Sequence, residues 1–131
     1  MLLLASALQA YAHISRNMFM LSNLNTDNGL SSPRVYSIVE AEDGAMWIST
    51  KRGVDRYNGQ QVTNYTLYTE MPYSDACGRS IKLTKDAQHL IYAYDNKGKV
   101  YIYDKRKDTF VLKCNLQKIL GGSIVLNELL V

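Results

Sequence analysis

The fold is indicated most clearly by residues 35–65, which read VYSIVEAEDGAMWISTKRGVDRYNGQQVTNY. Short runs rich in β-branched and aromatic residues follow one another, and a turn signal separates each run from the next. Asp43-Gly44 and Asn58-Gly59 are strong two-residue hairpin signals, because both positions of such a turn tolerate a positive φ. Gly53 can turn the chain between them. The stretch therefore predicts a four-stranded antiparallel meander, with strands at 35–39, 46–50, 54–57 and 61–65.

A second, weaker copy of this pattern occupies residues 79–113, where strands are expected at 79–83, 90–94, 100–103 and 109–112. Aligning Asp43 with Asp86, or Tyr57 with Tyr103, gives a repeat of about 43 to 46 residues, with Leu90 where the first copy has Trp47. Four strands at this period are typical of a propeller blade. A single β-sandwich of about eight strands is the alternative fold. A sandwich, however, does not require the same turn residues to recur at a fixed spacing along the chain. We therefore expect an all-β fold with blade 1 at 35–70 and blade 2 at 79–113.

The first twelve residues, MLLLASALQAYA, carry no charge, and Ala10 and Ala12 have the small-x-small spacing of a signal-peptidase site. They predict a signal peptide at 1–12 followed by a connector at 13–34, although no Lys or Arg precedes the apolar run. A buried N-terminal helix or strand is the alternative. Residues 114–131 are expected either to open a third blade or to form an apolar end.

The length of 131 residues suits one complete domain, but the repeat changes that interpretation. Without the leader, the chain holds about two to two and a half blades, whereas propellers close with about four to eight. We therefore expect an incomplete propeller: a fragment, a truncated reading frame or an oligomerising module. Hydrophobic residues make up 47% and charged residues 21%, which excludes a disordered tail, and the net charge of +3 is too small to indicate nucleic-acid binding.

Cys77 and Cys114 are the only cysteines. An exported chain could join them in a disulfide, but two separate buried thiols fit the sequence equally well. No C-x-x-C pair is present, so the sequence supports neither a zinc site nor a redox motif.

Residues 27–59 resemble the two-component regulator propeller repeat of bacterial hybrid sensors. Gly29-Leu30-Ser31 opens the pattern, Val35 and Ile38 occupy the first strand, Asp43-Gly44 and Trp47-Ile48-Ser49-Thr50 follow, and residues 53–59, GVDRYNG, close it. Ser49 replaces a glycine of the usual pattern, and Asp43 and Gly44 are adjacent rather than spaced. The second copy has no Gly-Leu-Ser opening, so its assignment depends on the periodicity.

The resemblance implies a periplasmic, oligosaccharide-sensing propeller of a hybrid two-component histidine kinase that regulates polysaccharide-utilisation genes. It implies an oligosaccharide ligand, an inner-membrane anchor elsewhere in the parent protein, and packing against further blades or self-association. From the residues themselves we expect no cofactor, no metal, no nucleic acid, no membrane contact and no catalytic residue in this segment. An autonomous exported module that self-assembles is the first alternative, and a small secreted hydrolase is the second.

Roles for individual side chains follow from residue type. Trp47 should pack blade against blade, and Arg56 should pair with either Asp43 or Asp55. Four tyrosines that alternate along two strands should share one face packed against the neighbouring blade: Tyr92, Tyr94, Tyr101 and Tyr103. Five aspartates lie at predicted turns, where the carboxylate commonly accepts from its own backbone: Asp43, Asp86, Asp95, Asp104 and Asp108.

More specific functions, such as catalysis, metal binding or nucleic-acid binding, find little support in these residues. His13 and His89 are expected to be solvated or partly packed rather than catalytic or metal-binding. Paired-carboxylate hydrolysis would require two of the turn aspartates to converge on a cleft. Proteins that bind single-stranded nucleic acid combine basic and aromatic side chains, and such a mixture occurs here at Lys97, Lys99 and residues 105–107 with the tyrosines between them. Nearby aspartates, however, offset the positive charge. Loop residues could contact a ligand: Arg34, Lys51, Arg52 and Tyr73.

Overall fold

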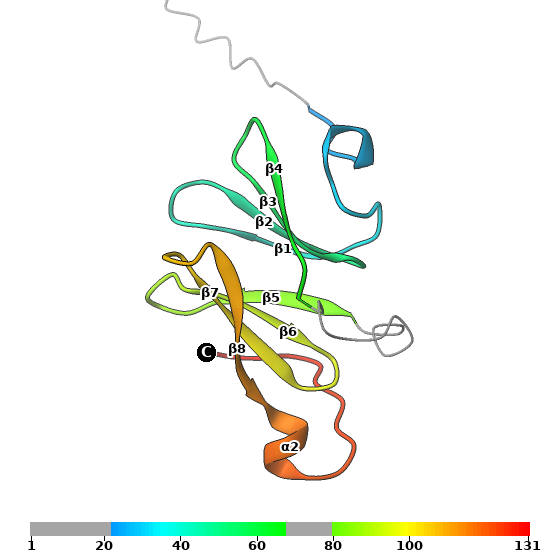
Figure 1. Cartoon of the computed structure of the whole chain (residues 1–131), viewed down its shortest axis with the longest axis vertical. Helices are drawn as coiled ribbons and strands as arrows, with labels where there is room; N and C mark the ends of the chain where they lie inside the picture. The colour runs from blue at the N-terminus through cyan, green and yellow to red at the C-terminus, as the bar shows by residue number, and fades with distance from the viewer. Residues whose placement is uncertain (1–21, 68–79) are drawn as a thin grey trace, which may run out of the picture.

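The computed structural model describes residues 22–67 and 80–131, and it contains two four-stranded antiparallel sheets (Figure 1). The strands of the first sheet are β1 (Val35–Glu40), β2 (Met46–Thr50), β3 (Gly53–Tyr57) and β4 (Val62–Tyr65). Those of the second are β5 (Ile81–Lys85), β6 (Ile91–Asp95), β7 (Lys99–Asp104) and β8 (Thr109–Asn115). Each sheet is a meander in chain order, which confirms the predicted all-β blades. A short 3-10 helix, η1 (Thr26–Asn28), precedes the first sheet, and α2 (Leu116–Leu120) follows the second.

The turn between β2 and β3 depends on the glycine at its end. Gly53 has φ of 152°, and a Cβ at this position would clash with the backbone carbonyl oxygen of Tyr65. Only glycine lets β4 lie this close to the turn. A hairpin is present at Asp43-Gly44 as predicted, but its turn is longer than two residues: Ala41 and Ala45 are hydrogen-bonded across it, and of the two signal residues only Gly44 has a positive φ, 77°.

The two sheets pack together, and β1 lies beside β5 (Figure 1). The core between them contains Trp47, Val54 and Tyr65 from the first sheet and Ile81, Leu83, Ile91, Ala93 and Tyr101 from the second. Trp47 is 2% exposed, and its ring lies 4.6 Å from that of Tyr103 and 5.6 Å from that of Phe110. This arrangement confirms the prediction that Trp47 packs one blade against the next.

Two hydrogen bonds, each between a side chain and a main-chain group, join the sheets along β1 and β5. The backbone N–H of Leu83 donates to Ser37 Oγ at 2.8 Å, and Lys85 Nζ donates to the carbonyl oxygen of Glu40 at 3.0 Å. Ser37 Oγ also lies 2.9 Å from Ser49 Oγ, and Ser49 is fully buried. The hydroxyl of Ser37 therefore satisfies a backbone donor of the neighbouring sheet.

The prediction that four tyrosines share one face is wrong. Tyr101 lies opposite Ala93 in the core between the sheets, whereas Tyr92 lies opposite Ile102 and Tyr94 opposite Val100. Residues directly opposite each other in a sheet point to the same side, so Tyr92 and Tyr94 lie on the outer face of the second sheet.

The strands also correct the alignment of the two copies. β2 begins at Met46 and β6 at Ile91, an offset of about 45 residues, so Tyr92 and not Leu90 corresponds to Trp47. Trp47 lies on the face of the first sheet that packs against the second sheet. Tyr92 lies on the face of the second sheet that is turned away from the first sheet. The second copy therefore keeps an aromatic residue at the blade-packing position.

Segments at both ends cover the outer faces of the sheets (Figure 1). At the N-terminal side, Leu30 is buried beside the first sheet. At the C-terminal side, the N–H of Leu126 donates to the carbonyl oxygen of Asn96, and Lys82 Nζ donates to that of Asn127. Residues 114–131, considered as the opening of a third blade, instead hold the end of β8, the helix α2 and a segment without a strand. Asn115 caps α2, and Gly121 and Gly122 have positive φ values.

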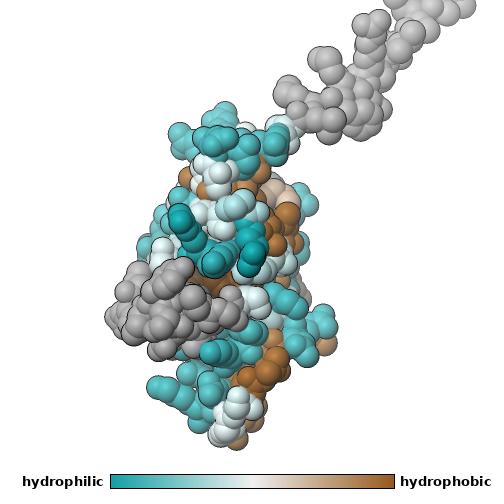
Figure 2. All heavy atoms as spheres, turned by 90° about the vertical axis from the view of Figure 1, so that its right-hand side faces the viewer, coloured by the Kyte–Doolittle hydropathy of each residue, from teal (hydrophilic) through white to brown (hydrophobic). Residues whose placement is uncertain are grey.

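On the face shown in Figure 2, polar side chains predominate and apolar surface is confined to separate patches. Among the described residues, no helix is long and apolar enough to cross a membrane.

Candidate functional site

A cavity of about 390 Å³, here called the inter-blade pocket, opens between the two sheets. The hairpin joining β1 to β2 forms one wall, and the hairpin joining β5 to β6 forms the other. Its lining comes from both sheets: Ala41, Glu42, Asp43, Trp47, Arg56, Gln88, His89, Leu90, Ile91, Tyr103 and Lys105. Its size falls within the usual range of small-molecule sites, about 300–1,000 Å³.

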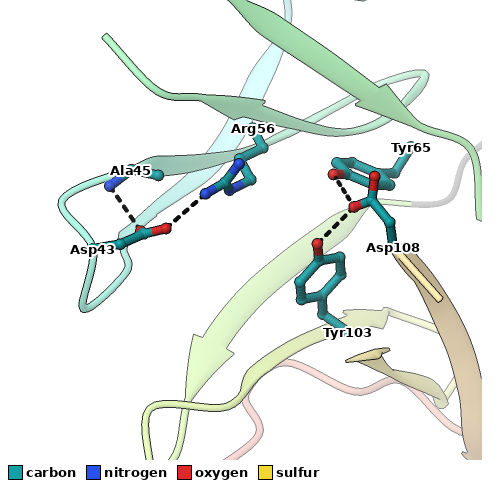
Figure 3. A network of polar contacts seen from close by, with 6 residues as sticks. All are labelled: Asp43, Ala45, Arg56, Tyr65, Tyr103 and Asp108. Carbon is teal, nitrogen blue, oxygen red and sulfur yellow. Dashed lines mark hydrogen bonds and ion pairs between the residues drawn. The ribbon is translucent and has the colours of Figure 1, made fainter. Parts of the chain in front are cut away.

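Arg56 pairs with Asp43 and not with Asp55. Its Nη2 donates to Asp43 Oδ2 at 2.6 Å (Figure 3). Its guanidinium carbon lies 5.7 Å from the centre of the Trp47 ring. The backbone N–H of Ala45 and the Arg56 guanidinium both lower the pKa of Asp43, which remains a carboxylate above acidic pH. The ion pair therefore fixes a charged and an aromatic group together in the pocket wall.

Two tyrosines from different sheets converge on one carboxylate (Figure 3). Tyr65 donates its hydroxyl to Asp108 Oδ1 at 2.7 Å, and Tyr103 donates to the same oxygen at 2.6 Å. These two donors lower the pKa of Asp108. Burial and the neighbouring carboxylate raise the pKa of Tyr65. Asp108 departs from the expected turn role, because its carboxylate joins the sheets.

This contact predicts a pH dependence of stability. A carboxyl whose pKa is lower in the folded than in the unfolded chain stabilises the fold above its unfolded pKa, about 4, and loses that contribution as pH falls through the folded pKa. We expect the urea midpoint to fall between about pH 5 and pH 3, and to fall less in Asp108→Asn, because asparagine tolerates the positive φ of 49° at position 108 as aspartate does. An equal fall of the urea midpoint with decreasing pH in both proteins would show that the contact does not stabilise the fold.

The raised pKa of Tyr65 adds a loss of stability above about pH 10.

His89 lies in the pocket wall in an unusual backbone conformation. Its φ is 62°, and its N–H donates to the carbonyl oxygen of Asp86, as the N–H of Gly44 donates to that of Ala41 in the first sheet. His89 therefore occupies the position that glycine occupies in the corresponding hairpin. A side chain in the left-handed region costs roughly 1–2 kcal/mol. Such local strain is concentrated at functional sites in proteins.

A second polar cluster, away from the pocket, anchors the segment before β1. Asp55 is fully buried, and its Oδ2 accepts from the N–H and the hydroxyl of Ser31 at 2.8 Å and 2.9 Å. Its Oδ1 accepts from Asn64 Nδ2 at 2.8 Å. Asn64 also donates to the carbonyl oxygen of Gly29. The residues of the Gly29-Leu30-Ser31 opening are therefore held by β3 and β4, which gives this short motif a structural role.

The structure does not bring the loop residues singled out from the sequence to the pocket. Arg34, Lys51 and Arg52 are exposed at the opposite ends of the strands, where the N–H of Lys51 donates to the carbonyl oxygen of Arg34. Tyr73, His13 and Cys77 lie outside the described residues, so a disulfide and two separate thiols both stay predictions for Cys77 and the half-buried Cys114.

The expected turn role is confirmed for four of the aspartates. Asp43 accepts from the N–H of Ala45, Asp86 from those of Gln88 and Leu90, Asp95 from those of Lys97 and Lys99, and Asp104 from that of Arg106. In the part of the chain that the structure describes, no group of His, Cys, Asp and Glu side chains is arranged to hold a metal ion. Sequence reasoning missed Glu42 and Gln88, which enter the pocket only through the packing of two hairpins.

Two packed four-stranded meanders, with an aromatic residue at the same position of each, define the class of structure as propeller blades. Residues 29–52 match the family model described as the two-component regulator propeller, so this stretch carries the repeat that the sequence resemblance indicated. The match begins at the glycine held by Asn64 and ends in the turn after β2. No curated protein matches the chain at a significant level.

Proposed function

We propose that this chain forms part of the ligand-sensing propeller of an exported two-component sensor that recognises oligosaccharides. The observation that carries the proposal is the regulator-propeller repeat on the first of two packed sheets. In this proposal the segment is non-catalytic and periplasmic, and binding shifts a conformational equilibrium that the rest of the sensor transmits. A ligand can do this only if its affinity differs between the two states.

Saturation-transfer NMR of the full chain with neutral and acidic oligosaccharides tests the ligand class. We expect transfer to at least one of them, and the same chain unfolded in urea serves as the control. Signals that are equal with folded and unfolded chain, or absent with every oligosaccharide, would contradict the proposal.

A fusion of bacterial alkaline phosphatase to the C-terminus tests export, because that reporter is active only where its disulfides can form. We expect activity with residues 1–12 present and none when they are deleted. Equal activity in both fusions would contradict the periplasmic part of the proposal.

A further inference from the structure

We propose that the inter-blade pocket binds an uncharged sugar of about one or two rings, held between the hairpins of the two sheets. This inference rests on the proposed function, since it assigns the site, the charge and the size of the saccharide unit that the propeller recognises.

The charge of the lining excludes strongly charged ligands. Arg56 and Lys105 are positive, and Glu42 and Asp43 are negative, so the formal charges cancel when His89 is neutral. An anionic ligand would lie beside two carboxylates, and a cationic one beside a guanidinium and an ammonium. Like charges in contact are unfavourable, so a neutral ligand fits this pocket best.

The pocket contains both hydrogen-bond donors and hydrogen-bond acceptors. Carboxylates only accept, Arg56 and Lys105 only donate, and Gln88 does both through its amide. Sugar hydroxyls both donate and accept, so they can use all of these groups. Apolar side chains complete the lining. Leu90 and Tyr103 are exposed enough to contact the C–H face of a sugar ring, whereas Trp47 and Ile91 are almost fully buried.

His89 places an imidazole on this wall of the pocket. Gly44 occupies the equivalent turn position in the first sheet without strain, whereas the second sheet places an imidazole there at a φ of 62°. The turn itself does not need the imidazole. The imidazole therefore adds a polar ring that can hydrogen-bond a sugar hydroxyl.

The experiment uses Trp47 as a reporter, because it is the only tryptophan and lines the pocket. Maltose, cellobiose and xylobiose are titrated into the full chain, and tryptophan emission is recorded together with saturation-transfer NMR. Glucuronic acid and glucosamine are compared with glucose to test the preference for an uncharged ring. We expect at least one neutral sugar to change the Trp47 emission and to bind more tightly than its charged counterpart.

Two variants and one matched control test the site. His89→Gly keeps the turn conformation and removes the imidazole, and Gln88→Ala removes the amide; each should weaken binding about three- to tenfold, as expected for one lost hydrogen bond. The control is Gln60→Ala, because Gln60 and Gln88 are both exposed glutamines whose N–H donates to the side chain two residues earlier. Gln60 does not line the pocket, so its variant should bind as the wild type does.

The outcomes separate this inference from the proposed function. Sugar binding that leaves Trp47 emission unchanged and is equal in His89→Gly and wild type would overturn the pocket and leave the sensing function intact. Binding of glucuronic acid or glucosamine as tight as that of glucose would overturn the preference for an uncharged ligand. Failure of every neutral and acidic saccharide to bind would overturn both proposals.

Discussion

Replacing Trp47 with alanine is expected to destabilise the folded chain by about 3–5 kcal/mol, the range for removing a large buried aromatic side chain. Trp47 is almost fully buried and contacts the rings of Tyr65, Tyr103 and Phe110. Its removal would leave a cavity between the two sheets and would also free Arg56 from its position over the indole. Urea unfolding followed by far-UV circular dichroism measures the loss without depending on tryptophan emission.

The matched control for this change is Tyr92→Ala. Tyr92 occupies the equivalent position in the second sheet, but it is half-buried on the outer face. We therefore expect a smaller loss of unfolding free energy, and also a smaller change in the urea midpoint. If the two variants are equally destabilised, then packing between the sheets does not dominate the stability of the chain.

Replacing Asp55 with alanine is expected to cost about 2–3 kcal/mol. The fully buried carboxylate accepts three hydrogen bonds, and its loss leaves the part-buried N–H of Ser31 without its acceptor. Asn64 is exposed and keeps the carbonyl oxygen of Gly29 as an acceptor. A hydrogen bond to a charged group contributes about 1.5–3 kcal/mol, and a buried donor left without a partner costs about 1–3 kcal/mol. The segment that begins the regulator-propeller match should then detach from β3 and β4, which amide hydrogen exchange at Leu30 and Ser31 would detect.

Asp43→Ala is the control for the Asp55 variant, because it removes a carboxylate from the same sheet. The Asp43 side chain is 57% exposed and forms a surface ion pair, so its loss should cost about 1 kcal/mol or less. Asp55→Asn should lie between the two, since an amide keeps one acceptor oxygen and sets its N–H groups against Asn64. An Asp55→Ala variant as stable as Asp43→Ala would contradict the anchoring role of the buried carboxylate.

The sheets and their order were predictable because their determinants are local. Gly44 fixes a hairpin through a positive φ that few other residues adopt, and the apolar runs on either side are too short for helices. The partner of Arg56 could also have been predicted from the sequence. Asp55 precedes Arg56 in one strand, so the two side chains point to opposite faces, which leaves Asp43 as the candidate.

The face of each tyrosine was harder to predict, since it depends on the length of the turn between β6 and β7. A register shift of one residue moves every side chain of a strand to the other face, and the run Asp95-Asn96-Lys97-Gly98 fits turns of more than one length. The inter-blade pocket was beyond prediction from local signals. Its walls come from hairpins in two sheets, whose relative position is set by the packing of Trp47 and the core around it.

The hydrogen bonds from Leu83 to Ser37 and from Lys85 to Glu40 have a consequence for how such repeats diverge. In each of them one partner is a main-chain group, an N–H in the first and a carbonyl oxygen in the second. Any amino acid except proline offers that N–H, and every amino acid offers that carbonyl oxygen. Position 40 can therefore vary in sequence without loss of its hydrogen bond, whereas Leu83 is also constrained by its place in the core between the sheets. A second sheet that departs from the regulator-propeller pattern can then keep both hydrogen bonds to the first sheet, provided that Ser37 and Lys85 are retained.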